Sequence, residues 1–171
     1  MLERLYSEGD SPLRYKINRL GGRSKQEKWI LQAELFNEIH RWVSGKKKVD
    51  ASMAAAKRRY EIVRDFLKAA EKAWGEAWGR DTYMVTRPVT IKAMLRVCFD
   101  LAATDADPAE TRLLRWTRRL APWSELVREL RAEGFYERFP AKGQVERVAR
   151  LHRELARAAK VEIKRSKAAE E

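Results

Sequence analysis

Apolar residues recur every three or four positions along most of the chain, which is the period of an amphipathic helix. The strictest run follows residue 50, where alternating three-residue and four-residue steps predict one long helix with Asp50 as its N-cap. Seven residues form its expected buried stripe: Met53, Ala56, Tyr60, Val63, Leu67, Ala70 and Trp74. Because this spacing places them on a single face, we expect that face to line the core.

The same spacing predicts another helix before the long one, over about residues 26–43 and ending at Gly45. Its expected buried face carries Trp29, Ala33, Phe36, Ile39 and Val43. Pro88 suits a first helical position and indicates a helix over about residues 88–103. The remaining expected helix boundaries lie at Asp107-Pro108-Ala109-Glu110, Pro122, Gly134 and Gly143.

A different period occurs near the start of the chain. Leu13, Tyr15 and Ile17 alternate with polar residues, which is typical of a short strand. The fold class we expect is therefore mostly α, a single-domain bundle of about six helices with one short N-terminal strand. Within it we expect an N-terminal extended segment and turn over residues 1–25, a helical domain over 26–163 and a frayed tail over 164–171.

The composition is typical of a soluble protein. The chain has 171 residues, 36% of them charged, and a mean hydropathy of -0.63. No stretch approaches the roughly 18 consecutive apolar residues of a membrane helix, and the first residues lack the apolar run of a secretory signal. We therefore expect no membrane partner and a cytoplasmic location.

Charge gives the strongest indication of a partner. Lys and Arg number 37 against 25 Asp and Glu, a formal net charge of +12 with a pI near 10.0. Basic residues exceed acidic ones in both halves of the chain, so the excess is not confined to a tail. Such a balance favours polyanions, of which nucleic acid is the commonest.

Clusters of basic residues flank the predicted turns, where their side chains can reach phosphates. The candidate nucleic-acid-binding residues are Arg14, Lys16, Arg19, Arg23, Lys25, Lys46, Lys47, Lys48, Lys57, Arg58 and Arg59. A further cluster, Arg115, Arg118 and Arg119, is the alternative site. Each cluster alone is commonly a solvated face, but phosphate binding sums many modest contacts. No predicted helix carries a base-reading arrangement, so we expect largely sequence-independent binding to duplex DNA.

Candidate chemistry is sparse. The two histidines, His40 and His152, match no metal-ligand motif, and we expect structural or surface roles for both. Cys98 lies among apolar residues and is expected in the core. The glycines at 21 and 22 precede Arg23 and Lys25 without the spacing of a nucleotide phosphate loop. We therefore expect no enzymatic activity, no cofactor, no metal and no small-molecule substrate.

Several local motifs occur in an order that points to a known family. They are Ser11-Pro12-Leu13 leading to Gly21, Ala73-Trp74-Gly75-Glu76-Ala77-Trp78, Tyr83-Met84-Val85-Thr86 before Ile91-Lys92-Ala93-Met94-Leu95, and Gly134-Phe135-Tyr136. This order resembles the C-terminal part of DGQHR-domain proteins, which include the DndB-like proteins of DNA phosphorothioation loci. The Asp-Gly-Gln-His-Arg motif that defines the family is absent, so no functional residue is carried over. The resemblance implies a helical C-terminal portion of such a protein.

Two functional hypotheses follow. The first is a DNA-associated accessory or regulatory module of a DNA-modification, phage-defence or mobile-element system. The alternative is a non-enzymatic protein-interaction subunit that completes a separately encoded DGQHR-type half. In the second case the segment through Gly22 is expected to be poorly ordered alone, because an isolated short strand leaves its backbone groups unpaired.

Overall fold

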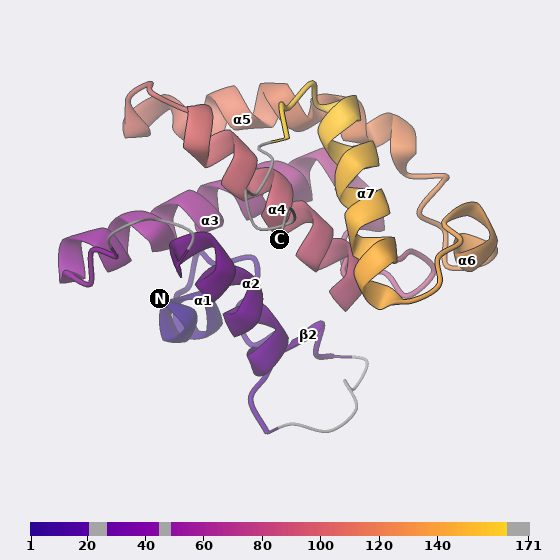
Figure 1. Ribbon diagram of the computed structural model, residues 1–171, viewed down its shortest axis with the longest axis horizontal. Coiled ribbons are helices and arrows are strands. Elements are labelled where there is room, and N and C mark those ends of the chain that lie inside the picture. The colour runs from indigo at the N-terminus through magenta and orange to yellow at the C-terminus, as the bar shows by residue number, and fades with distance from the viewer. Residues whose placement is uncertain (21–26, 45–48, 164–171) are drawn as a thin grey trace, which may run out of the picture.

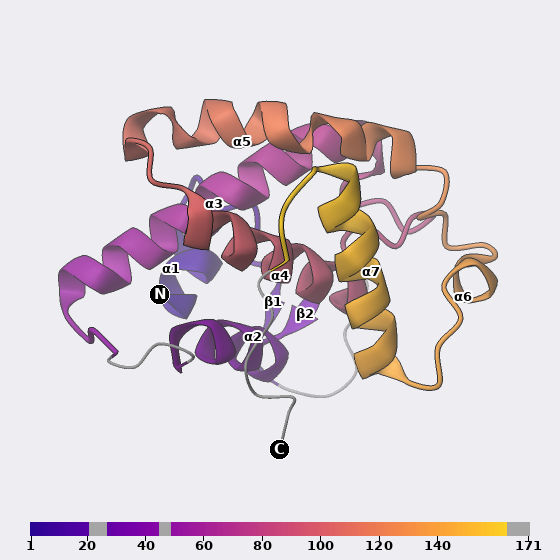
Figure 2. The same cartoon turned by 45° about the horizontal axis from the view of Figure 1, so that its top comes forward.

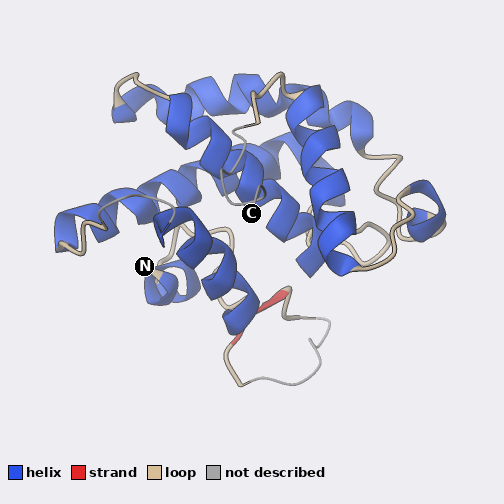
Figure 3. Ribbon diagram, viewed as in Figure 1, coloured by secondary structure: helices blue, strands red, loops and turns tan. Residues whose placement is uncertain are grey.

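A computed structural model describes residues 1–20, 27–44 and 49–163, and it confirms a mostly α fold. The α-helices are α1 (Leu2–Ser7), α2 (Gln32–Ser44), α3 (Met53–Trp74), α4 (Pro88–Thr104), α5 (Arg112–Leu120), α6 (Phe135–Arg138) and α7 (Gln144–Ala158). Three 3-10 helices are η1 (Gly75–Ala77), η2 (Ala109–Thr111) and η3 (Ala121–Leu126), and two short strands are β1 (Ile17–Asn18) and β2 (Ile30–Leu31). Figure 3 shows how little of the described chain is strand.

Helix α4 is the centre of the bundle. It packs against α2, α3 and α7, while α5 lies along α3 on the far side (Figures 1 and 2). Residues on nearly every side of α4 are buried, from Val89 near its start to Leu101 near its end. Cys98 is fully buried within it, as the sequence predicts. No helix in the described part of the chain is long and apolar enough to cross a membrane.

Aromatic side chains fill the space between α3, η3 and α7. Trp74 stacks on Trp123 with ring centroids 5.3 Å apart, and Phe66 meets Trp123 edge-on. The Trp123 Nε1–H donates to the Leu155 carbonyl at 2.9 Å, so this large ring is buried with its polar atom paired. These contacts join the middle of the chain to its last helix.

The predicted stripe on α3 is largely confirmed. Tyr60, Val63, Leu67 and Trp74 are buried on one face. Met53, which was expected to belong to it, is 85% exposed, because the first turn of α3 extends beyond the elements that cover the rest.

The N-cap of α3 also differs from the prediction. Ser52 is the cap, with its Oγ accepting from the Ala55 N–H at 3.2 Å. The Asp50 carboxylate instead accepts from the Ser52 N–H at 2.9 Å.

The helix predicted over about residues 26–43 is shorter than expected, and part of the face that it buries differs from the predicted one. It starts at Gln32, because the preceding residues form β2. Ile39 of the predicted face is buried, and Trp29 and Val43 pack against the core. Ala33 and Phe36 are exposed, so the predicted face is confirmed only in part.

Ion pairs add to the apolar contact between α2 and α4, in which Trp42 stacks on Phe99 with ring centroids 4.5 Å apart. Lys92 bonds Glu34 at 2.8 Å and Arg96 bonds Glu38 at 3.0 Å.

The N-terminal segment belongs to the same core. Residues Leu2–Ser7 form α1, which the extended segment predicted over 1–25 did not include, and Leu5 and Leu13 are fully buried. β1 pairs in parallel with β2, Ile17 opposite Ile30. Of the expected strand, only Ile17 lies in β1, while Leu13 and Tyr15 lie in the turn before it. The pairing with β2 contradicts the expectation, made for the interaction-subunit hypothesis, that a short strand here lacks a partner within the chain.

The remaining boundaries differ by small shifts. The start signal at Asp107 leads into η2, and α5 begins only at Arg112. Between the expected boundaries at Pro122 and Gly134 the chain forms η3 and turns, and the one-turn α6 follows Gly134. Helix α7 begins directly after Gly143, as expected, and Val148, Leu151 and Leu155 are buried while Val145 is 80% exposed on its first turn.

Candidate nucleic-acid interface

The predicted basic residues fall into separate groups. Arg14, Lys16 and Arg19 lie together on the N-terminal segment, and Lys57, Arg58 and Arg59 lie on the first turns of α3. The others lie outside the described residues: Arg23, Lys25, Lys46, Lys47 and Lys48.

A cation–aromatic cluster forms where α1, the turn before β1 and the start of β2 meet. We use this name for four cations, Arg14, Lys16, Arg19 and Lys28, and three aromatic residues, Tyr6, Tyr15 and Trp29. The Arg19 Cζ lies 4.8 Å from the Tyr6 ring centroid, and the Lys28 Nζ lies 5.9 Å from it. Such contacts hold cations in place at a small cost in side-chain entropy.

The other two cations contact separate rings. The Arg14 Cζ lies 4.9 Å from the Tyr15 ring centroid, and the Lys16 Nζ lies 5.2 Å from that of Trp29. Among the described residues, no carboxylate lies within ion-pair distance of Arg14 or Lys16. Their charges are therefore open to an outside anion.

Backbone geometry fixes Tyr15 in the middle of the cluster. It has a positive φ of 57°, a left-handed conformation that costs a non-glycine residue about 1–2 kcal/mol. The Tyr15 N–H donates to the Tyr6 carbonyl at 2.9 Å, and the Lys28 Nζ donates to the Tyr15 carbonyl at 2.7 Å. These bonds hold the turn, and the Tyr15 ring stays 52% exposed.

One acidic residue faces the cluster. Glu3 pairs with Arg19 at 3.2 Å, with both side chains well exposed. An exposed pair of this kind contributes about 0–1 kcal/mol, so a phosphate can replace the carboxylate at little cost.

A polar network fastens the segment to α3. Asp10 accepts from the Tyr60 hydroxyl at 3.1 Å and pairs with Lys68 and Arg64, both at 3.3 Å. Burial and the bond to Asp10 raise the pKa of Tyr60 to about 12, so the phenol stays neutral. Partial desolvation opposes the ionised form of Asp10, but the bonds from Tyr60 and Lys68 outweigh it and lower its pKa.

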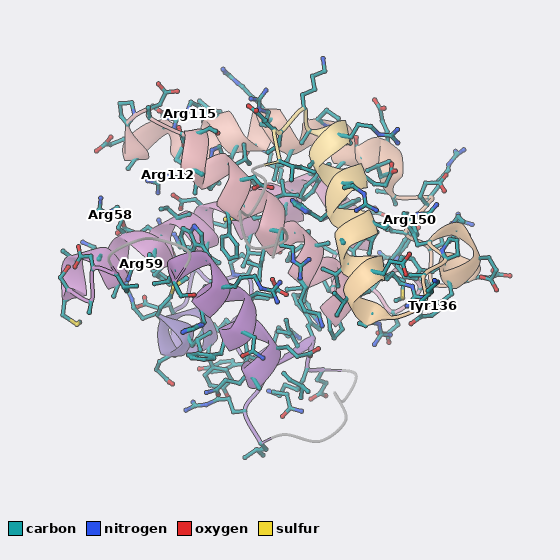
Figure 4. All side chains as sticks on the ribbon, in the orientation of Figure 1. Arg58, Arg59, Arg112, Arg115, Tyr136 and Arg150 are labelled. Atoms are coloured by element: carbon teal, nitrogen blue, oxygen red, sulfur yellow. The ribbon has the colours of Figure 1, made fainter. Side chains whose placement is uncertain are left out.

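Lys57, Arg58 and Arg59 do not form one patch. Consecutive positions on a helix point about 100° apart. Lys57 lies 3.9 Å from Glu61, Arg58 is exposed and Arg59 is half-buried. Figure 4 shows Arg58 and Arg59 at the end of the molecule where Arg112 and Arg115 also lie, opposite Tyr136 and Arg150.

The alternative site on α5 is smaller than its sequence suggests. Arg115 bonds both oxygens of Asp105, at 2.7 and 2.8 Å, and the Pro108 carbonyl at 2.9 Å. These contacts hold the Arg115 side chain against the loop before α5. Two exposed cations, Arg118 and Arg119, are left on this helix.

One pair of ionisable side chains, a histidine and an aspartate, was not predicted from the sequence. The His152 Nε2 lies 2.6 Å from the Asp100 Oδ2, joining α7 to α4, and both side chains are nearly buried. Helical spacing cannot reveal it, because the two residues are far apart in sequence.

Burial raises the pKa of the Cys98 thiol, which leaves it protonated and unreactive. Within the described ranges, no group of three or more His, Cys, Asp or Glu could hold a metal ion.

Lys28, Tyr6 and Tyr15 were also missed as site residues. Tyr15 was visible as part of the strand pattern, but its exposure depends on the turn that ends α1. Lys28 joins the cluster only because β2 returns beside β1.

The chain matches no protein-family model, no curated protein and no solved structure. A functional assignment therefore depends on the site itself.

Proposed function

We propose that this protein binds duplex DNA through its backbone phosphates at the cation–aromatic cluster. The observation that carries the proposal is the grouping of Arg14, Arg19 and Lys28 around the adjoining rings of Tyr6 and Tyr15, with Lys16 next along the chain on the ring of Trp29. Three of these four cations were predicted from the sequence. Phosphate contacts of this kind release counterions and do not depend on base sequence.

Two further features support a polyanionic partner. The net charge of +12 raises the local concentration of any polyanion around the whole molecule. The aromatic rings orient the cations before binding, so less side-chain entropy is lost when a phosphate arrives. Together they favour fast association and many weak contacts.

The biological setting rests on the resemblance to DGQHR-domain proteins. We place the protein as an accessory or regulatory module of a DNA-modification, phage-defence or mobile-element system, acting in the cytoplasm without catalysis of its own. The Ser11-Pro12-Leu13 motif of that resemblance lies in the turn that builds the cluster.

The test is a titration of a labelled random duplex at several salt concentrations. Four phosphates neutralised at the cluster contribute about -4 to the slope of log affinity against log salt. The double variant Lys16→Gln, Arg19→Gln is expected to flatten that slope by about 2, since two contacts are lost.

The matched control removes the same charge from α5 with Arg118→Gln and Arg119→Gln, and it should leave the slope unchanged. Absence of binding at low salt contradicts the proposal. Equal flattening in both double variants contradicts the assignment of the site.

A second candidate is the protein-interaction subunit, and one feature favours it. Among the described residues, β1 and β2 form a sheet of two strands, and Leu20, which follows β1, is 98% exposed. A large apolar side chain exposed beside a short sheet is a feature of surfaces that contact a protein partner. Co-purification with a DGQHR-type protein, and loss of it after Leu20→Asp, would support this candidate.

A further inference from the structure

A groove of about 380 Å³ adjoins the cation–aromatic cluster and shares Arg19 with it. It lies between the end of β1 and the first turns of α2, where Gln32, Phe36 and Asn37 line it. Its volume falls within the range of sites that hold small organic groups, about 300–1,000 Å³. Among the described residues that line it, none is acidic.

Phe36 gives the groove its aromatic surface. The sequence predicts this side chain in the core, yet it is 50% exposed. Its ring stacks on that of His40, one turn further along α2, with centroids 5.6 Å apart and planes 26° from parallel. A third planar group can extend such a stack.

We propose that this groove takes an unpaired nucleobase of a strand whose phosphates lie on the cation–aromatic cluster. The inference rests on the proposed function and specifies its substrate further. The base stacks on Phe36, and the amides of Gln32 and Asn37, which can both donate and accept hydrogen bonds, meet its polar edge.

Geometry and charge favour a base over other flat molecules. Arg19 borders both the groove and the cluster, so it can contact the phosphate attached to the base in the groove. A base within an intact duplex is covered on both faces by its neighbours and cannot stack on Phe36. The protein should therefore prefer a single strand, or a duplex with an unpaired base, over a perfect duplex.

The experiment compares three labelled probes: a twelve-nucleotide thymidine strand, a perfect duplex of that length and the same duplex with one bulged thymidine. Phe36→Ala should weaken binding of the single strand and the bulged duplex about tenfold, which is the usual contribution of one stacked base. Binding of the perfect duplex should change by less than twofold. Phe36→Tyr, which keeps the ring, should restore both affinities.

The matched control is Tyr136→Ala, which removes an aromatic ring of similar exposure, 55%, on α6 at one end of the molecule (Figure 4). It should alter none of the three affinities. Circular dichroism of each variant shows whether the fold is kept; Phe36 is on the surface, so we expect no loss.

Four results would overturn the inference. Equal loss for perfect duplex and single strand in Phe36→Ala assigns Phe36 to general binding, while no loss for any probe leaves duplex binding intact and removes the base site. Full competition by thymidine monophosphate, at the same concentration of nucleotide as the strand, identifies a site for free nucleotides. Failure of all three probes to bind overturns the proposed function as well.

Discussion

At the scale of single residues, helical period identifies the core, but tertiary contacts decide which members of a stripe are buried. Leu67 and Met53 belong to the same predicted stripe on α3, yet Leu67 is fully buried and Met53 is 85% exposed. Leu67→Ala should lower the free energy of unfolding by about 2–5 kcal/mol through lost burial and a cavity. Met53→Ala should change it by less than about 0.5 kcal/mol. Urea unfolding of both variants measures the difference, and similar losses would contradict the structure.

The candidate site shows the same limit. Arg14, Lys16 and Arg19 were predicted because cations beside a turn can reach phosphates. Lys28 and Tyr6 were not, since their contact depends on how β2 and α1 come together in space. Phe36 was assigned to the core because period alone cannot separate an apolar residue that packs from one that stays exposed.

At the scale of elements, the sequence predicts those whose contacts are apolar and local. Helix α4 matches its prediction within a residue or so because Pro88 marks its start and its apolar residues are continuous. Helix α2 does not, since residues 30–31, expected within it, form β2 instead. Its contact with α4 also adds ion pairs of Glu34 and Glu38 to the Trp42–Phe99 stack, and no apolar pattern reveals such pairs. The pairing of β1 with β2 is equally non-local.

The contact between the N-terminal segment and α3 carries a pH-dependent prediction. Tyr60 has its pKa raised to about 12, above the ordinary 10.0, so its neutral form stabilises the fold. This stabilisation is fully present below pH 10 and is lost as the pH rises from about 10 through 12. Tyr60→Phe should lower the free energy of unfolding by about 1 kcal/mol at pH 8, because the bond to Asp10 is lost. This variant should also lack the part of the stability loss between pH 10 and 12 that comes from ionisation of Tyr60.

Urea unfolding at pH 8 and pH 11 checks this expectation. Tyr136→Phe, on the exposed α6, is the control and should follow the wild-type protein at both pH values. A wild-type decline that persists undiminished in Tyr60→Phe would assign the effect to other groups.

At the scale of the whole molecule, the basic excess is distributed over several elements rather than gathered on one. Asp65 and Arg112 are paired in the interior at 3.2 Å, and Arg115 holds a loop, so part of the charge is structural. The number of cations therefore overstates the number of phosphate contacts. Under the proposed function, the salt dependence of each variant shows which of these groups contact DNA.

The sequence predicts that Lys46, Lys47 and Lys48 also contact phosphates, because they follow the expected end of a helix, where a turn is predicted. Replacing all three by Gln should flatten the slope of log affinity against log salt by up to about 3. The same duplex titration measures it, with Arg118→Gln, Arg119→Gln as the control for lost charge. Tight binding with an unchanged slope in the triple variant would confine the contacts to the cation–aromatic cluster. A slope flattened in both the triple variant and the control would mean that long-range charge, rather than contact, sets the affinity.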